Sequence, residues 1–217
     1  QNKTFLLKGV TGSGKTEVYM TFIEQALKQG KTAIMLVPEI SLTPQMMQRF
    51  TSRFPNDVAV LHSRLSDGER FDEWEKIFSG NAHVILGARS AIFAPVKNLG
   101  VIVIDEEHDG SYVSENNPRY DAHTVAEFRA RANACPLILG SATPSLESYN
   151  KAMKGEFQLV ELKQRINGSA MPDIEIVDMT NEVMDGNMSP FSKSLVAKLD
   201  KCVKDKKQAI IFINRRG

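Results

Sequence analysis

The stretch GVTGSGKTEVY at residues 9–19 decides the fold class of this chain. It fits the pattern G-x-x-x-x-G-K-[ST], whose glycines let the backbone curl so that successive N–H groups point at phosphate oxygens. A short apolar strand is expected before it at residues 5–7. The helix that follows has one apolar face, made of Tyr19, Phe22, Ile23, Ala26 and Leu27. A Gly/Ser turn before a helix is the alternative, but such a turn does not need this setting of strand, loop and helix. The stretch therefore predicts a nucleoside triphosphate site.

The residues of this phosphate loop have separate expected roles. The loop itself should bind ATP through Gly9, Val10, Thr11, Gly12, Ser13, Gly14, Lys15 and Thr16. Lys15 should reach the β- and γ-phosphates, which makes it a catalytic residue as well, and the Thr16 hydroxyl should hold Mg²⁺. The helix that begins near Lys15 adds the positive end of its dipole.

Composition sets limits on the function. With 217 residues, the chain can form one sizeable α/β domain or one domain and part of a second. A hydrophobic share of 42% and a charged share of 24% are typical of a globular protein, and a net charge of +1 means that any contact with a polyanion must be local. Cys135 and Cys202 have no metal-binding spacing and suggest no disulfide, which fits a reducing cytoplasm. No signal peptide or membrane-spanning run is apparent, so we expect a cytoplasmic protein without a membrane partner.

Apolar strands alternate with amphipathic helices along most of the chain. Further strands are predicted at residues 32–37, 58–61, 83–86, 100–104 and 136–139. Helices are predicted at 42–54, near 122–132 and at 145–153, and another is predicted to begin at a capping box formed by Ser66 and Glu69. This alternation predicts an α/β fold with a mostly parallel sheet and helices on both faces.

The composition changes after about residue 161, and this change suggests three parts. Residues 1–162 should form the nucleotide-binding domain and residues 163–189 a linker with one short strand candidate at 174–177. Residues 190–217 should begin a second domain, with Ser189 as helix N-cap, Pro190 in the first turn, a helix at 191–203 and a strand at 209–213. We expect the chain to be a piece of something longer.

A second candidate site follows the apolar strand at residues 100–104, which runs into Asp105-Glu106-Glu107-His108. Downstream of a phosphate loop, a carboxylate at this point is expected beside the Mg²⁺ that Thr16 holds. Asp105 is the candidate metal ligand, through water, and Glu106 is the candidate base that orients and deprotonates the attacking water. His108 could sense the γ-phosphate or couple to another element. The alternative is a solvated charged turn, which the upstream phosphate loop disfavours.

Two further loops follow predicted strands. Ser141 and Thr143 in GSATPS (140–145) could bridge the acidic cluster to whatever the domain binds, although Thr143 before Pro144 is by itself better explained as a helix cap. Arg89 and Ser90 in GARSAIFAP (87–95) could contact nucleic-acid phosphates, or Arg89 could be an ordinary surface charge.

These motifs, in this order, resemble the superfamily 2 helicases of the DEAH-box type. More narrowly, the chain is similar to the bacterial replication-restart helicases over nearly its whole length. The segments that carry this likeness are GVTGSGKTEVY (9–19), LVPEISLTPQ (36–45), GARSAIFAP (87–95), DEEHDGSY (105–112), GSATPS (140–145) and FINRRG (212–217).

The resemblance implies a RecA-like first motor domain and the start of a second. It implies an ATP-dependent 3′→5′ DNA helicase that acts at stalled or abandoned forks for primosome assembly and replication restart. His108, Ser141 and Thr143 would couple hydrolysis to movement. Residues 109–120 match an aromatic-rich loop that touches single-stranded DNA, in which Tyr112 and Tyr120 could stack on bases or could as easily be core or surface tyrosines. Implied partners are single-stranded and forked DNA, primosome proteins and single-strand-binding proteins, with the protein a monomer in the bacterial cytoplasm.

The sequence also departs from the resemblance. Residues 121–124 are Asp-Ala-His-Thr where H-A-R-D is usual, which removes an expected Arg and weakens a DNA role there. Four features of such helicases are expected outside this chain: the fork-binding domain, the adenine motif with its glutamine, the zinc-binding cysteines and the arginine finger. We therefore expect Mg²⁺ as its metal, zinc only in the remainder of the parent protein, and weak ATP binding and turnover by this part alone. An ATP-driven double-strand DNA translocase and an ATP-gated assembly switch remain as alternatives.

Overall fold

The computed structural model describes residues 3–166 and 172–213 of the chain. These residues belong to two compact units, divided between residues 169 and 170. The first unit contains the whole sheet and every motif before residue 146, so it is described first.

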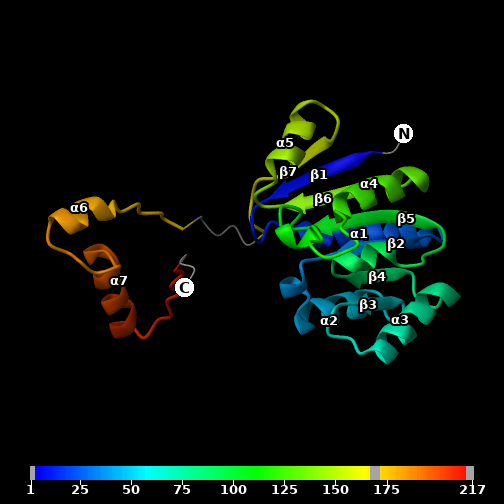
Figure 1. Ribbon diagram of the computed structural model, residues 1–217, viewed down its shortest axis with the longest axis horizontal. Coiled ribbons are helices and arrows are strands. Elements are labelled where there is room, and N and C mark those ends of the chain that lie inside the picture. Colours follow the sequence, from blue (N-terminus) through cyan, green and yellow to red (C-terminus); the bar gives the residue numbers. More distant parts are fainter. Residues whose placement is uncertain (1–2, 167–171, 214–217) are drawn as a thin grey trace. The chain divides into compact units, whose positions relative to one another are not determined.

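The first unit is built on a sheet of seven strands whose pairings are all parallel. Figure 1 shows their order, β3-β4-β2-β5-β6-β1-β7. The strands are β1 (Thr4–Gly9), β2 (Thr32–Leu36), β3 (Val58–Leu61), β4 (Val84–Gly87), β5 (Leu99–Asp105), β6 (Leu137–Ser141) and β7 (Gln158–Leu162). Because the strands are parallel, the loops after β1, β5 and β6 emerge at one edge of the sheet.

Helices cover both faces of this sheet. They are α1 (Lys15–Lys28), α2 (Pro44–Arg53), α3 (Asp67–Ser79), α4 (Ala122–Ala132) and α5 (Leu146–Met153), with short 3₁₀ turns η1 (Glu39–Ser41), η2 (Arg89–Phe93) and η3 (Gly110–Tyr112). Alternate residues of the central strands join two separate cores: Ile34 belongs to the cluster that includes residues of α3, α4 and α5, whereas Ala33 and Met35 belong to the cluster that includes residues of α1 and α2. The predicted α/β class with helices on both faces of a mostly parallel sheet is confirmed.

Several predicted elements differ from the observed ones. Helix α2 begins at Pro44 with Thr43 as its N-cap, so residue 42 lies outside it. The capping box at Ser66 and Glu69 is confirmed. The predicted Thr143 cap is wrong, because the Ser145 side chain accepts from the N–H of Ser148 and α5 begins one residue later. Strand β7 was not predicted, since its residues are only partly buried and show no regular apolar alternation.

The second unit, as far as residues 172–213 describe it, contains two helices and no strand. They are α6 (Met179–Met184) and α7 (Lys193–Lys204), and α7 is capped by Ser192 rather than by Ser189. The strands predicted at 174–177 and 209–213 are therefore wrong for these described residues, because a strand needs a neighbour to pair with. Residues 214–217 of the FINRRG motif lie outside the described part. None of the helices in the described ranges is long and apolar enough to cross a membrane.

Candidate functional site

The phosphate loop joins β1 to α1 in a conformation that its glycines make possible. Gly12 and Gly14 have φ angles of 80° and 92°, in the left-handed region that side chains disfavour. The loop closes through a hydrogen bond of 3.0 Å from the Ser13 N–H to the Val10 carbonyl. The chain after β7 returns to this loop, where the Ile166 N–H donates to the Gly12 carbonyl at 3.1 Å. The predicted setting of strand, loop and helix is confirmed.

Two polar groups of this loop are buried inside its curve. Lys15 is 9% exposed, and its Nζ donates to the Gly9 carbonyl at 2.9 Å. The Ser13 hydroxyl is buried and, within the described residues, has no hydrogen-bond partner. A concave loop with an ammonium group, an unsatisfied hydroxyl and a helix N-terminus fits a polyphosphate. Thr16, the second residue of α1, is half-buried at the same helix end.

Asp105 ends β5 beside Gly140 of β6 and faces α1. Its Oδ1 accepts hydrogen bonds from the Tyr19 hydroxyl at 2.9 Å and from the Glu106 N–H at 3.0 Å. Burial raises the pKa of the Asp105 carboxyl, and the hydrogen bond from Tyr19 opposes this rise. Burial and the neighbouring Asp105 likewise raise the pKa of Tyr19, so its hydroxyl stays a donor. Tyr19 thus orients the carboxylate that sequence reasoning proposed for Mg²⁺.

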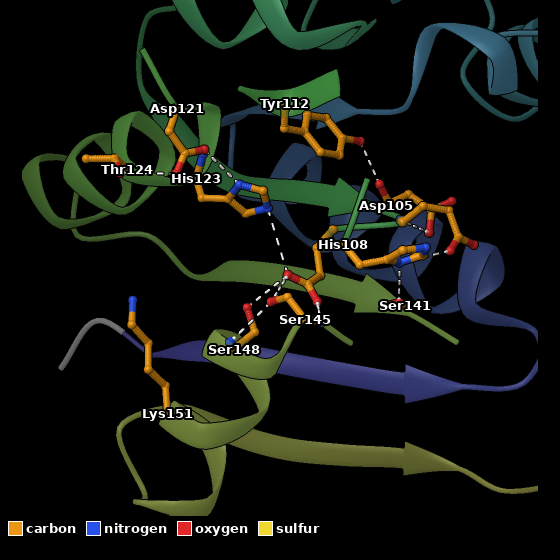
Figure 2. A network of polar contacts seen from close by, with 12 residues as sticks. Asp105, His108, Tyr112, Asp121, His123, Thr124, Ser141, Ser145, Ser148 and Lys151 are labelled. Atoms are coloured by element: carbon orange, nitrogen blue, oxygen red, sulfur yellow. Dashed lines mark hydrogen bonds and ion pairs between the residues drawn. The ribbon is translucent and has the colours of Figure 1, made fainter. Parts of the chain in front are cut away.

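Glu106 lies between the phosphate loop and the histidine of the same turn. Its carboxylate is 3.8 Å from Lys15 Nζ on one side and 3.7 Å from His108 Nδ1 on the other. His108 Nδ1 is also 2.7 Å from the Ser141 hydroxyl (Figure 2). This hydroxyl accepts from the Thr143 N–H at 3.0 Å. The structure therefore brings together Lys15, Glu106, His108 and Ser141, which come from three separate stretches: the start of α1, the turn after β5 and the end of β6. Thr143 contributes its backbone, and its side chain is exposed.

Sequence reasoning did not assign a role to Glu107 or to the hydroxyl of Tyr19. Glu107 is 2% exposed and accepts hydrogen bonds from Ser145 and Ser148 at the start of α5. Tyr19 was predicted only as a member of the buried face of α1. The signal in the sequence is a polar group at a position expected to be buried, as at Glu107 and Tyr19, because a buried hydroxyl or carboxylate needs a partner. The partner itself could not have been identified without the fold.

The residues expected to touch DNA do not share one environment. Arg89 donates to the carbonyls of Ser111 at 3.1 Å and Val113 at 2.6 Å, and its guanidinium lies 5.4 Å from the centre of the Tyr120 ring. These contacts of Arg89 stabilise η3 and the residue that follows it. Ser90, next to Arg89, is exposed. Tyr120 is half-buried, with Phe93 against its ring at 4.9 Å between ring centres.

Tyr112 is different, because it is fully buried and donates from its hydroxyl to the Asp105 carbonyl at 2.6 Å. Burial raises its pKa, and no face of its ring is open to a base in this conformation. Of residues 121–124, which depart from the resemblance, Ala122 is buried, His123 is half-buried and Thr124 is exposed. Asp121 caps α4, and the His123 ring meets Tyr112 edge-on at 5.4 Å between ring centres.

Comparison with known proteins follows the same motifs. The sequence pattern of the family described as "DEAD/DEAH box helicase" matches residues 1–152, well over half of the chain. The chain belongs to the DEAD/DEAH box helicase family. Because this match covers the phosphate loop, the acidic turn and GSATPS, the predicted family resemblance is confirmed.

Within this helicase family, the chain is similar to proteins named "Replication restart protein PriA". It is 55% identical to that of Bacillus subtilis (strain 168) over 217 residues, which is all of this chain and 27% of that protein. The Synechocystis protein is 48% identical and the Haemophilus influenzae protein 42% identical, each over 98% of this chain. The predicted likeness to replication-restart helicases is confirmed, and the chain spans between a quarter and a third of the length of these relatives.

Solved structures agree on the fold of this helicase-family chain. The structure titled "Structure of RecG bound to three-way DNA junction" matches 95% of this chain and 29% of that chain, with a TM-score of 0.55 at 22% identity. The Mss116p DEAD-box helicase domain 2 matches 94% of this chain and 78% of its own, with a TM-score of 0.53 at 12% identity. At these identities the likeness concerns the fold alone, and it confirms the predicted RecA-like architecture.

Proposed function

We propose that residues 1–162 form the ATP-hydrolysing motor domain of a DNA helicase that acts in replication restart. One observation carries this proposal: the turn after β5 lies against the phosphate loop, with Glu106 3.8 Å from Lys15. The similarity to replication restart proteins supports the biological role, and the family supports the use of ATP and Mg²⁺.

In this proposal the phosphate loop binds the triphosphate of ATP. Gly9 to Thr16 supply the backbone N–H groups and the Lys15 ammonium, which would exchange its contact with the Gly9 carbonyl for phosphate oxygens. Thr16 and Asp105 would hold Mg²⁺, which neutralises charge on the β- and γ-phosphates. Tyr19 keeps the Asp105 carboxylate oriented toward that position through its hydrogen bond.

Glu106 is the proposed base for the attacking water. Its carboxylate lies next to Lys15, within reach of the place where the γ-phosphate would bind, and it can accept a proton from a water there. His108 keeps contact with both Glu106 and Ser141. A shift of the segment that bears Ser141 and Thr143 would therefore change the position of His108, and we propose that this couples hydrolysis to movement.

DNA would be contacted by the loops after β4 and η3. We propose Arg89, Ser90 and Tyr120 as the residues of this surface and omit Tyr112, which is buried. With a net charge of +1, such contacts must be local, and single-stranded or forked DNA would need other parts of the parent protein as well. The same proposal includes the 3′→5′ direction, the primosome and single-strand-binding partners, the monomeric state and the cytoplasmic location. It also includes the division into residues 1–162, 163–189 and 190–217.

The test is ATP hydrolysis by the full-length gene product without DNA, with blunt duplex and with a branched fork. We expect the fork to stimulate turnover most. Lys15→Ala should lower kcat/KM about 10²–10³-fold because it removes a phosphate ligand without a core contact. Lys28→Ala, on the exposed last turn of the same helix, is the matched control and should have no effect.

The possible outcomes separate the three functions. Equal stimulation by blunt duplex would favour a double-strand translocase, and turnover indifferent to all DNA would favour an assembly switch. Normal hydrolysis in Lys15→Ala would contradict the assignment of the nucleotide site itself.

A further inference from the structure

Glu107 is the most deeply buried acidic side chain of the turn after β5. Its side chain is 1% exposed, and its carboxylate lies at the start of α5. Oε1 accepts from the Ser145 N–H at 2.7 Å, and Oε2 accepts from the hydroxyls of Ser145 at 3.0 Å and Ser148 at 2.9 Å (Figure 2). Charge-assisted hydrogen bonds of this kind are among the strongest in proteins. Glu107 therefore ties the turn to the first turn of α5.

The backbone next to Glu107 is strained. Glu106 has a φ angle of 46°, in the left-handed region that residues with a side chain rarely adopt. Such a conformation persists only where neighbouring contacts enforce it. The Glu107 N–H donates to the Gly140 carbonyl at 3.0 Å, and the Asp109 N–H donates to the Glu106 carbonyl at 2.8 Å. Together with the buried Glu107 side chain, these bonds fix both ends of the Glu106 peptide unit.

The turn and the segment from Ser141 to Ser148 are therefore joined at two points. His108 contacts Ser141 at the beginning of this segment, and Glu107 contacts Ser145 and Ser148 toward its end. Glu106 directly precedes the two residues that make these contacts, and its carboxylate lies next to Lys15. His123 of α4 encloses the Glu107 carboxylate from another side, with its Nε2 3.9 Å from Oε2. The turn cannot shift on its own while these contacts remain.

We propose that Glu107 is a positioning residue that holds Glu106 in its strained, hydrolysis-competent orientation and transmits movements of the 141–148 segment to it. This inference rests on the proposed function of Glu106 as the base. Glu107 itself touches neither the phosphate loop nor the position proposed for the nucleotide. Its loss should therefore reduce the rate of hydrolysis rather than the affinity for nucleotide.

The test is Glu107→Gln in the full-length protein. The amide keeps the size of the side chain but replaces one acceptor oxygen by a donor, so it cannot accept all three hydrogen bonds. We expect kcat for ATP hydrolysis to fall about 10–100-fold, as for other small displacements of a catalytic group, with the affinity for ATP unchanged. Thr32→Val is the matched control, because it also removes a buried polar contact: the Thr32 hydroxyl, at the start of β2, donates to the Lys97 carbonyl at 2.9 Å.

Amide hydrogen exchange in the absence of nucleotide gives a second readout that does not depend on turnover. In Glu107→Gln we expect faster exchange at residues 105–109 and at residues 145–148 together, and in Thr32→Val at neither. A kcat no lower than that of Thr32→Val, or acceleration confined to residues 145–148, would overturn the inference. If the unmodified protein did not hydrolyse ATP, the proposed function would be refuted. Faster exchange in both segments of Glu107→Gln would, even then, show that the two segments are coupled.

Discussion

The hydrogen bond from Tyr19 to Asp105 connects residues 86 positions apart and can be removed with a single oxygen atom. Tyr19 is fully buried on α1, and Tyr19→Phe deletes the hydroxyl that donates to Asp105 Oδ1 at 2.9 Å. The Glu106 N–H then remains as the other donor to the same oxygen. The ring keeps its packing, so the change isolates the polar contact.

The size of the effect follows from the burial of Asp105. A hydrogen bond to a charged group contributes about 1.5–3 kcal/mol, and the carboxylate of the half-buried Asp105 is only partly open to water that could replace the lost donor. Burial raises the pKa of Asp105 above its ordinary value of 3.8, while the Tyr19 hydrogen bond holds it down. Without Tyr19 that pKa should rise further. Because a metal ligand must be deprotonated, the Mg²⁺ concentration for half-maximal hydrolysis should rise as well.

The sign of the pH dependence is fixed by the same contact. The hydrogen bond stabilises the ionised carboxylate, so its contribution is present above the pKa of Asp105 and is lost as the pH falls through it. The deficit in stability of Tyr19→Phe should therefore be full at neutral pH and should begin to shrink while the pH is still above 3.8, because the pKa is raised.

The assay is thermal unfolding between pH 5 and 8 with a Mg²⁺ titration of ATPase activity, both on the full-length protein. Tyr149→Phe is the control, since Tyr149 lies partly exposed on α5 with Lys8 over its ring. If the two variants gave the same unfolding midpoints and the same Mg²⁺ dependence, the assigned role of Tyr19 would be refuted.

Two further predictions concern packing within the first unit. Gly140→Ala would place a Cβ 2.6 Å from the Cζ of Tyr19 and closer still to its hydroxyl, so we expect little soluble protein, with partial recovery in combination with Tyr19→Phe; equal yields of wild type and Gly140→Ala would contradict the observed packing. Cys135 is 2% exposed, and burial raises the pKa of its thiol. In the 217-residue chain, a Cys202→Ser variant should therefore react slowly with a thiol reagent at pH 8 until it is unfolded. Rapid reaction of the folded variant would count against this core.

Local patterns allowed much of the first unit to be predicted. The phosphate loop is encoded in eight consecutive residues, and the central strands are apolar on both faces because two cores enclose them. Strand β7 was not predicted because it is not enclosed in this way: it pairs with β1 alone at the edge of the sheet, and its residues are partly exposed. The predicted strand at 209–213 has the composition of a strand, yet composition cannot supply a pairing partner.

Side-chain burial was harder to foresee than motif membership. Tyr112 and Tyr120 belong to one stretch and share one predicted role, but Tyr112 is buried with its hydroxyl on the Asp105 carbonyl, while Tyr120 is half-buried beside Arg89. The difference arises from η3, which places Tyr112 in the core that also contains α4. A motif identifies which residues are near a site but not which of them face it.

The register of three parallel strands explains why the site depends on the whole sheet. Gly140 of β6 pairs with Leu7 of β1 on one side and with Asp105 of β5 on the other. A slip of one residue in either pairing would turn Asp105 or the start of the phosphate loop to the opposite face of the sheet. Because Gly140 lacks a side chain, Tyr19 can cross this point to reach Asp105. The distance between Lys15 and the acidic turn is thus set by strand pairings that no local sequence pattern contains, and this is why the residues of the site could be predicted while most of their partners could not.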